Sequence, residues 1–113
     1  MAYYLRIKKV LSMNGVIEKT ENEGNILTVE GENIAKVAMA LSSRTRIQIL
    51  NFIKSKEVDM QEIAELIKQS KANASAQMRI LEGVGLVKTS YKPGIRGVKK
   101  VCSTDVKEIR FKF

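Results

Sequence analysis

The side chains best suited to chemistry in this sequence are cations gathered into one stretch. Between positions 68 and 100 there are eight lysines and arginines and a single acidic residue, Glu82. This basic stretch therefore carries +7 of the formal net charge of +8. Because lysine and arginine bind phosphate oxygens, a cluster of this kind predicts a polyanionic partner. Nucleic acid is the first candidate and an acidic membrane surface is the second.

The first half of the basic stretch is predicted to be a helix that reads bases. In Lys71–Glu82 the apolar residues Ala74, Met78 and Leu81 share one face. The other positions hold small residues, which allow a helix to enter a major groove, and side chains that hydrogen-bond base edges. The residues predicted to contact DNA from this helix are Lys71, Asn73, Ser75, Ala76, Gln77 and Arg79.

The second half of the stretch is predicted to be a hairpin that holds the DNA backbone. Two segments rich in Val, Thr and Tyr, Leu86–Tyr91 and Val98–Cys102, have the composition of short strands. Between them, Pro93-Gly94 predicts a type II turn, because Pro presets φ and Gly accepts a positive φ. We refer to this hairpin as the wing. The residues of the wing that are predicted to bind phosphates are Lys92, Arg96, Lys99 and Lys100.

Most catalytic and metal chemistry lacks its usual residues here. The chain has no histidine and one cysteine, Cys102, which fits a reducing cytosol and is expected to be a small buried hydrophobe. We therefore expect neither an enzyme nor a cofactor nor a metal site. No apolar run reaches the roughly 18 residues of a membrane span, and no signal peptide is evident, which predicts a cytoplasmic protein without a membrane partner.

Two further helices are predicted before the basic stretch. Residues 32–41 have one apolar stripe, and a second helix is expected from Arg44 to about Lys54, capped by Ser42 or Ser43. The first stripe consists of Ile34, Val37, Ala38 and Leu41, and the inward residues of the second helix are expected to be Ile47, Leu50 and Ile53.

A third helix completes the frame that must position the reading helix. Asp59 and Glu62 form a capping-box pattern at its start, and Met60, Ile63, Ala64 and Ile67 are its expected buried residues. The tight turn 68–70 leads to the reading helix, which Ser70 caps and glycines end. Helix, three-residue turn, helix and basic hairpin are the order of a winged helix-turn-helix, an α+β fold.

The two ends of the chain are predicted to contain additional strands. Residues 1–31 form an N-terminal extension, with a possible β-hairpin around Asn22–Asn25 that contacts the sheet or a second subunit. Residues 32–105 are the expected DNA-binding domain, and residues 106–113 a C-terminal strand with Ile109, Phe111 and Phe113 on one face. We expect this face to be covered by the Tyr3–Met13 segment and by the second subunit.

Two segments resemble a known family. Ala40–Leu50, ALSSRTRIQIL, resembles the AL-(S/A)-x-x-T-R-x-x-IL segment of arsenic-repressor-like (ArsR-like) winged-helix regulators of archaea and bacteria. Residues 63–87 are similar to that family's ELA…S…S…LK-x-L…GLV run through Ser70, Ser75, Leu81, Gly85, Leu86 and Val87. The resemblance covers about residues 34–102. It implies a dimeric regulator whose fourth helix enters the major groove.

The chain departs from the metal-sensing members of that family. Val58–Glu62 stands where they have paired cysteines, and the chain lacks the histidines of their last helix. The sequence therefore predicts no metal sensing, and it identifies no other small-molecule effector.

These observations favour a sequence-specific regulator of transcription. We expect a repressor that binds double-stranded DNA as a homodimer at a roughly palindromic site. The alternatives are an architectural, chromatin-type protein that binds duplex DNA without sequence preference, a winged helix used only for protein contacts and, least favoured, an enzyme. Affinity for a palindrome relative to random duplex at fixed salt separates the first alternative from the hypothesis.

Overall fold

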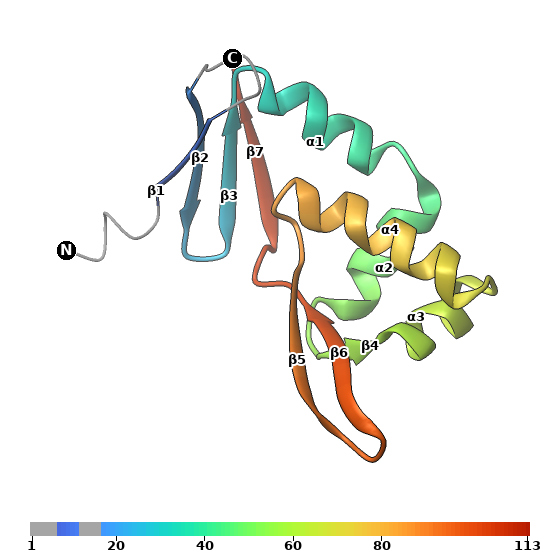
Figure 1. Ribbon diagram of the computed structural model, residues 1–113. Helices are drawn as coiled ribbons and strands as arrows, with labels where there is room; N and C mark the ends of the chain where they lie inside the picture. The colour runs from blue at the N-terminus through green and yellow to red at the C-terminus, as the bar shows by residue number, and fades with distance from the viewer. Residues whose placement is uncertain (1–6, 12–16) are drawn as a thin grey trace. The chain divides into compact units, whose positions relative to one another are not determined.

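The computed structural model describes residues 7–11 and 17–113, which form two compact units (Figure 1). The first unit contains the described residues up to Met39 and Val106–Phe113, and the second is Ala40–Asp105. In chain order the elements are β1 (Ile7–Leu11), β2 (Ile17–Glu23), β3 (Ile26–Glu30), α1 (Asn33–Leu41), α2 (Arg44–Ile53), β4 (Val58–Asp59), α3 (Met60–Ile67), α4 (Lys71–Gly83), β5 (Lys88–Gly94), β6 (Gly97–Ser103) and β7 (Glu108–Lys112).

The first unit is built on a four-stranded sheet with the order β1-β2-β3-β7. The predicted N-terminal hairpin is confirmed: β2 and β3 pair antiparallel, with a two-residue turn whose first residue, Gly24, has a φ of +64°. The C-terminal strand is also present, and it pairs parallel with β3. The neighbour of β7 in the sheet is therefore β3. The Tyr3–Met13 segment is the one expected to cover the face of Ile109, Phe111 and Phe113. Of that segment the structure describes only β1, which lies at the opposite edge of the sheet from β7.

Helix α1 has the predicted length but a different buried face. Val37 and Ala40 are buried, Ile34 and Leu41 are half-buried, and Ala38 is exposed. The prediction that Ala38 belongs to the buried stripe is therefore wrong. Ala40 takes its place because positions 37 and 40, three residues apart, lie on the same side of a helix.

Helix α2 begins where expected and also presents a different face to the core. Ser43 caps it, and the Oγ atom of Ser43 accepts a hydrogen bond from the N–H of Arg46 at 3.3 Å. The buried residues are Ile49 and Ile53, whereas Ile47 is 39% exposed and Leu50 is half-buried. The prediction that Ile47 and Leu50 point inward is therefore wrong. The core contacts Ile49 and Ile53, which are four residues apart and lie on one side of the helix.

Helices α3 and α4 confirm the sequence analysis closely. The Asp59 Oδ1 atom accepts from the Glu62 N–H at 2.8 Å, and Glu62 Oε2 accepts from the Asp59 N–H at 3.0 Å, which completes the capping box. All four residues expected to be buried in α3 are buried, and so are Ala74, Met78 and Leu81 of α4. Lys68 ends α3 in the left-handed conformation, and Ser70 caps α4 through the N–H of Asn73.

The wing is a longer hairpin than expected, with its turn displaced. β6 pairs with β5 on one side and with the short β4 on the other, so β5 is an edge strand (Figure 1). Gly94 faces Gly97, which leaves Ile95 and Arg96 as the two turn residues. The prediction of a type II turn centred on Pro93-Gly94 is therefore wrong. Proline is tolerated within β5 because an edge strand has one side without ladder hydrogen bonds.

Candidate nucleic-acid interface

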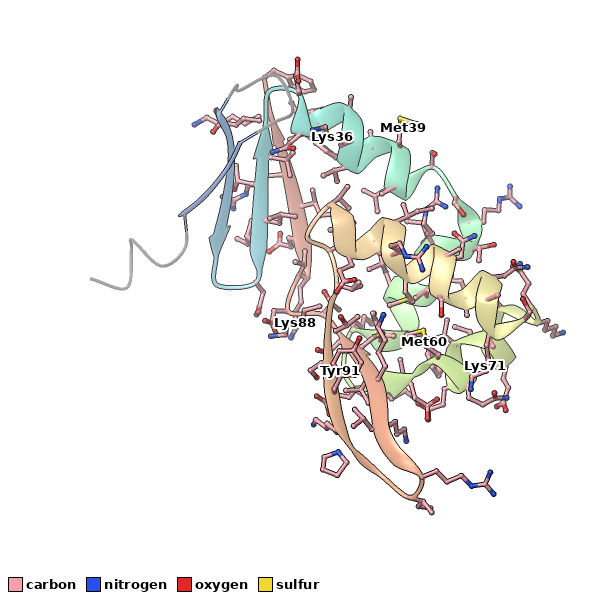
Figure 2. The ribbon with its side chains drawn as sticks, in the orientation of Figure 1. Lys36, Met39, Met60, Lys71, Lys88 and Tyr91 are labelled. Carbon is pink, nitrogen blue, oxygen red and sulfur yellow. The ribbon has the colours of Figure 1, made fainter. Side chains whose placement is uncertain are left out.

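A groove of about 400 Å³ separates the start of α4 from the tip of the wing. Both elements belong to the second unit, and Figure 2 shows Lys71 at the start of α4. Five of the predicted DNA-binding residues line this groove together, namely Lys71, Ser75, Arg96, Lys99 and Lys100. The remaining lining residues are Asp59, Met60 and Gln61 from the beginning of α3, with Gly94, Ile95, Gly97 and Val98 from the wing.

Helix α4 presents the predicted face to solvent. Ala74, Met78 and Leu81 are at most 1% exposed and anchor one side of the helix in the core. The predicted contact residues Lys71, Asn73, Ala76 and Arg79 are exposed, and Ser75 and Gln77 are half-buried. The N-terminus of α4, where unpaired backbone N–H groups attract anions, borders the groove through Lys71.

Gln77 has a partner that sequence reasoning missed. The Arg46 Nη1 atom donates a hydrogen bond to Gln77 Oε1 at 2.8 Å, and Arg46 Nε donates to the carbonyl oxygen of Ala40 at 2.6 Å. Arg46 is half-buried. The sequence feature that could have indicated this role for Arg46 is the Thr45-Arg46 pair, which lies in the segment Ala40–Leu50 that resembles the family.

Several wing cations are paired with acids from outside the basic stretch. Lys99 Nζ lies 3.0 Å from Asp59 Oδ2, Lys92 forms an ion pair with Glu57, and Lys88 Nζ lies 2.6 Å from Asp105 Oδ2. These contacts reduce the positive charge of the wing below what the sequence count suggests. Within residues 7–11 and 17–113, Lys71, Arg79, Arg96 and Lys100 form no ion pair with an acidic side chain.

The pair between Asp59 and Lys99 links the wing to the cap of α3. One carboxylate oxygen of Asp59 accepts from the Glu62 N–H while the other faces Lys99. The backbone hydrogen bond from Glu62 is the main reason that the pKa of Asp59 is lowered from 3.8, and the Lys99 ammonium adds to it. Asp59 is therefore a charged carboxylate at the edge of the groove at neutral pH.

Cys102 lies in the core of the second unit. It is fully buried and has no disulfide, and burial raises the pKa of its thiol to about 11. Within the described part of the chain, no group of three or more His, Cys, Asp or Glu side chains is placed to hold a metal ion. No helix among the same residues has the length and apolar character needed to span a bilayer.

Comparison with known proteins agrees with this architecture. Residues 43–89 match the family model described as "Bacterial regulatory protein, arsR family". Over these residues the chain is similar to the DNA-binding domain of arsR-family regulators. The family consists of DNA-binding transcription regulators, not enzymes, and the resemblance noted in the sequence is confirmed over these residues. No curated protein matches the chain.

Solved structures of regulators share the fold. A possible transcriptional regulatory protein of Mycobacterium bovis is 26% identical, with a TM-score of 0.57 over 66% of this chain and 75% of that one. The solution structure of Mb0332 from the same organism, described as a homodimeric winged helix-turn-helix DNA-binding domain, has the same identity and TM-score, with 66% and 65% covered. Reduced HlyU from Vibrio cholerae, at 21% identity and a TM-score of 0.55 over 64% and 72%, shows likeness of fold alone.

Proposed function

We propose that the protein is a sequence-specific regulator of transcription that represses its targets by binding double-stranded DNA as a homodimer. The observation that carries the proposal is the shared groove, in which Lys71 of α4 and Arg96 and Lys100 of the wing lie around one concave surface. A groove bordered by cations from a helix start and a hairpin tip fits a phosphate backbone running between them.

In this proposal α4 reads the bases. The exposed Ala76 and Arg79 lie on the face opposite the buried Ala74 and Met78, and the exposed Asn73 lies on the flank of the helix. Asn and Arg provide bidentate hydrogen bonds to base edges, and Ala allows close approach to a thymine methyl group. Gln77 contributes through its amide NH₂ group, because its carbonyl oxygen already accepts from Arg46.

The wing contacts the backbone beside the bases that α4 reads. Arg96, in the two-residue turn, and Lys100, on β6, bind phosphates and release counterions, as does Lys71 at the start of α4. Lys92 and Lys99 contribute less, because each first has to leave an acidic partner. The homodimer rests on the family resemblance and on Mb0332, whose winged-helix domain is homodimeric. Two-fold symmetry gives a roughly palindromic site.

The test is selection of preferred duplexes from a random library, followed by affinity measurements at one salt concentration. We expect the selected site to be palindromic and to bind at least about 10³-fold more tightly than its scrambled version. Arg79→Ala should reduce that preference by about 1–3 kcal/mol, and Lys54→Ala, which removes an exposed cation outside the groove, should leave it intact. A reporter with the site over its promoter should be repressed. Equal affinity for selected and scrambled duplexes would establish the architectural alternative instead.

A further inference from the structure

The C-terminal strand β7 leaves one side of its backbone open. It lies at the end of the sheet order, with β3 as its neighbour among the described strands. The Glu108 N–H donates to the carbonyl oxygen of Asn25 at 3.1 Å, so Glu108 points its backbone groups at β3. Because alternate residues of a strand face the same neighbour, the N–H and C=O groups of Ile109 and Phe111 face the open edge.

The apolar face of the sheet extends from β3 onto β7. Leu27 and Val29 of β3 are 3% and 0% exposed, and they stand beside Ile109 and Phe111 in the parallel register. Paired residues lie on the same face, so the buried face of β3 continues onto β7. There Phe111 is 38% exposed, and Phe113 beyond it is fully exposed. An open edge with such a face needs a partner that continues the sheet.

We propose that β7 pairs antiparallel with β7 of a second copy, about a two-fold axis through Arg110, to form one continuous eight-stranded sheet. The proposal rests on the homodimer of the proposed function and assigns it a surface. In this register Glu108 faces Lys112 of the second copy at both ends of the ladder, and Ile109 faces Phe111. The outward backbone groups of Ile109 and Phe111 then bond each other, as an antiparallel hydrogen-bonded pair requires.

Read antiparallel in full overlap, the strand sequence Glu-Ile-Arg-Phe-Lys places Glu108 of each copy opposite Lys112 of the other. Opposite charges meet at the two ends, and the apolar face becomes continuous across the axis. The two Arg110 side chains meet at the axis as like charges, and each is diagonal both to a Glu108 and to a Lys112 of the other copy. A register shifted by two residues places Glu108 opposite Arg110 and leaves Lys112 outside the ladder.

Charge reversal tests both the surface and the register. Glu108 and Lys112 are exposed, so Glu108→Lys and Lys112→Glu should leave the fold intact, as circular dichroism would verify. Each variant alone places like charges opposite each other twice, and its dimer dissociation constant in sedimentation should rise at least about tenfold. Mixing the two variants restores opposite charges at both ends and should restore dimers. Glu32→Lys and Lys54→Glu make the same charge changes at exposed positions outside β7 and should sediment like the unmodified chain.

Two further readouts separate this proposal from the proposed function. Amide exchange at Ile109 and Phe111 should slow as protein concentration rises, whereas exchange at Glu108 and Arg110, which face β3, should not change. Glu108→Lys should still bind a half-site duplex and lose the extra affinity for the full site. Failure of the unmodified protein to prefer any site would count against the proposed function and leave the sedimentation result standing. A dimer unaffected by either charge reversal, or not restored by mixing, would overturn the β7 interface.

Discussion

The guanidinium of Arg46 donates a hydrogen bond from Nη1 to the Oε1 atom of Gln77 at 2.8 Å and thereby links α2 to α4. A guanidinium only donates, so the Gln77 amide must present its oxygen to Arg46 and its NH₂ group to the other side. A bidentate contact with adenine needs both ends of the amide. Gln77 is therefore restricted to donating, and Arg46 determines how it is oriented.

The first prediction concerns this link. Arg46→Ala and Gln77→Ala should each destabilise the protein, and the double variant should lose about 1 kcal/mol less than the sum of the two, because the shared hydrogen bond can be lost only once. The measurement is the free energy of unfolding in urea for the four proteins. Gln77→Glu, which keeps an acceptor opposite the guanidinium, is the matched control and should preserve the coupling. Strict additivity would contradict a role for Arg46 in holding Gln77.

The second prediction concerns base reading by α4. Arg79 is exposed and forms no ion pair among the described residues, so its guanidinium remains available to a guanine edge. Arg79→Ala should reduce the free energy of binding to the selected site by about 1–3 kcal/mol and change random-duplex affinity little. Arg79→Lys should recover random binding and only part of the preference, since lysine lacks the planar fork. Equal loss on both duplexes would assign Arg79 to the backbone.

The sequence predicted α3 and α4 correctly because the residues that define each helix lie within a few positions of one another. Asp59 and Glu62 form the capping box within one turn, and the buried stripe of α4 alternates clearly with polar positions. In α2, by contrast, Ile47, Ile49, Leu50 and Ile53 cover more than one face. Periodicity alone therefore fits two stripes, and packing against the rest of the unit selects Ile49 and Ile53.

The charge partners of the wing could not be predicted from local pattern. Glu57 lies 35 positions from Lys92 in the sequence, and only the β4-β6-β5 sheet brings the two together. The basic stretch therefore predicts a polyanion partner but overstates how many of its cations are available, because several are paired with acids. The turn lies at Ile95-Arg96 and not at the predicted Pro93-Gly94, because the pairing of β5 with β6 continues past the proline.

The third prediction is a pH dependence of stability that arises from Asp59. Its pKa in the folded protein is below 3.8, mainly through the Glu62 N–H, so its charged form stabilises the fold. This contribution is complete above the unfolded-state pKa and is lost as the pH falls through the lower folded-state value. Asp59→Asn keeps a cap and removes the charge, so it should be about 0.5–1 kcal/mol less stable than the unmodified chain at pH 7. Urea unfolding should show that difference closing in strong acid, whereas Asp59→Ala should remain less stable throughout.

The fourth prediction concerns Cys102, the only cysteine. With a pKa of about 11 only about one thiol in a thousand is ionised at pH 8, and the side chain is fully buried. The native protein should therefore react with a thiol reagent only as fast as it opens, and denaturant should accelerate the reaction strongly. Cys102→Ala should preserve affinity for the selected site, and Cys102→Ser should destabilise by about 1–3 kcal/mol because it buries a hydroxyl. Rapid native labelling, with loss of DNA binding, would make Cys102 a redox-sensitive position.

The fifth prediction distinguishes the two kinds of cation in the wing. Arg96→Ala should weaken binding to every duplex alike and reduce the slope of log affinity against log salt by about one unit, since one phosphate contact is lost. Lys99→Ala should reduce the slope by less, because Lys99 has to leave Asp59 before it can bind a phosphate. Asp59→Asn removes the competing carboxylate from the groove while keeping a cap on α3, so it should strengthen binding to all duplexes and steepen the slope. Fluorescence anisotropy across a salt series, on selected and scrambled duplexes, measures all three. A slope that falls equally for Lys99→Ala and Arg96→Ala, with no gain for Asp59→Asn, would show that the ion pair does not restrain the wing.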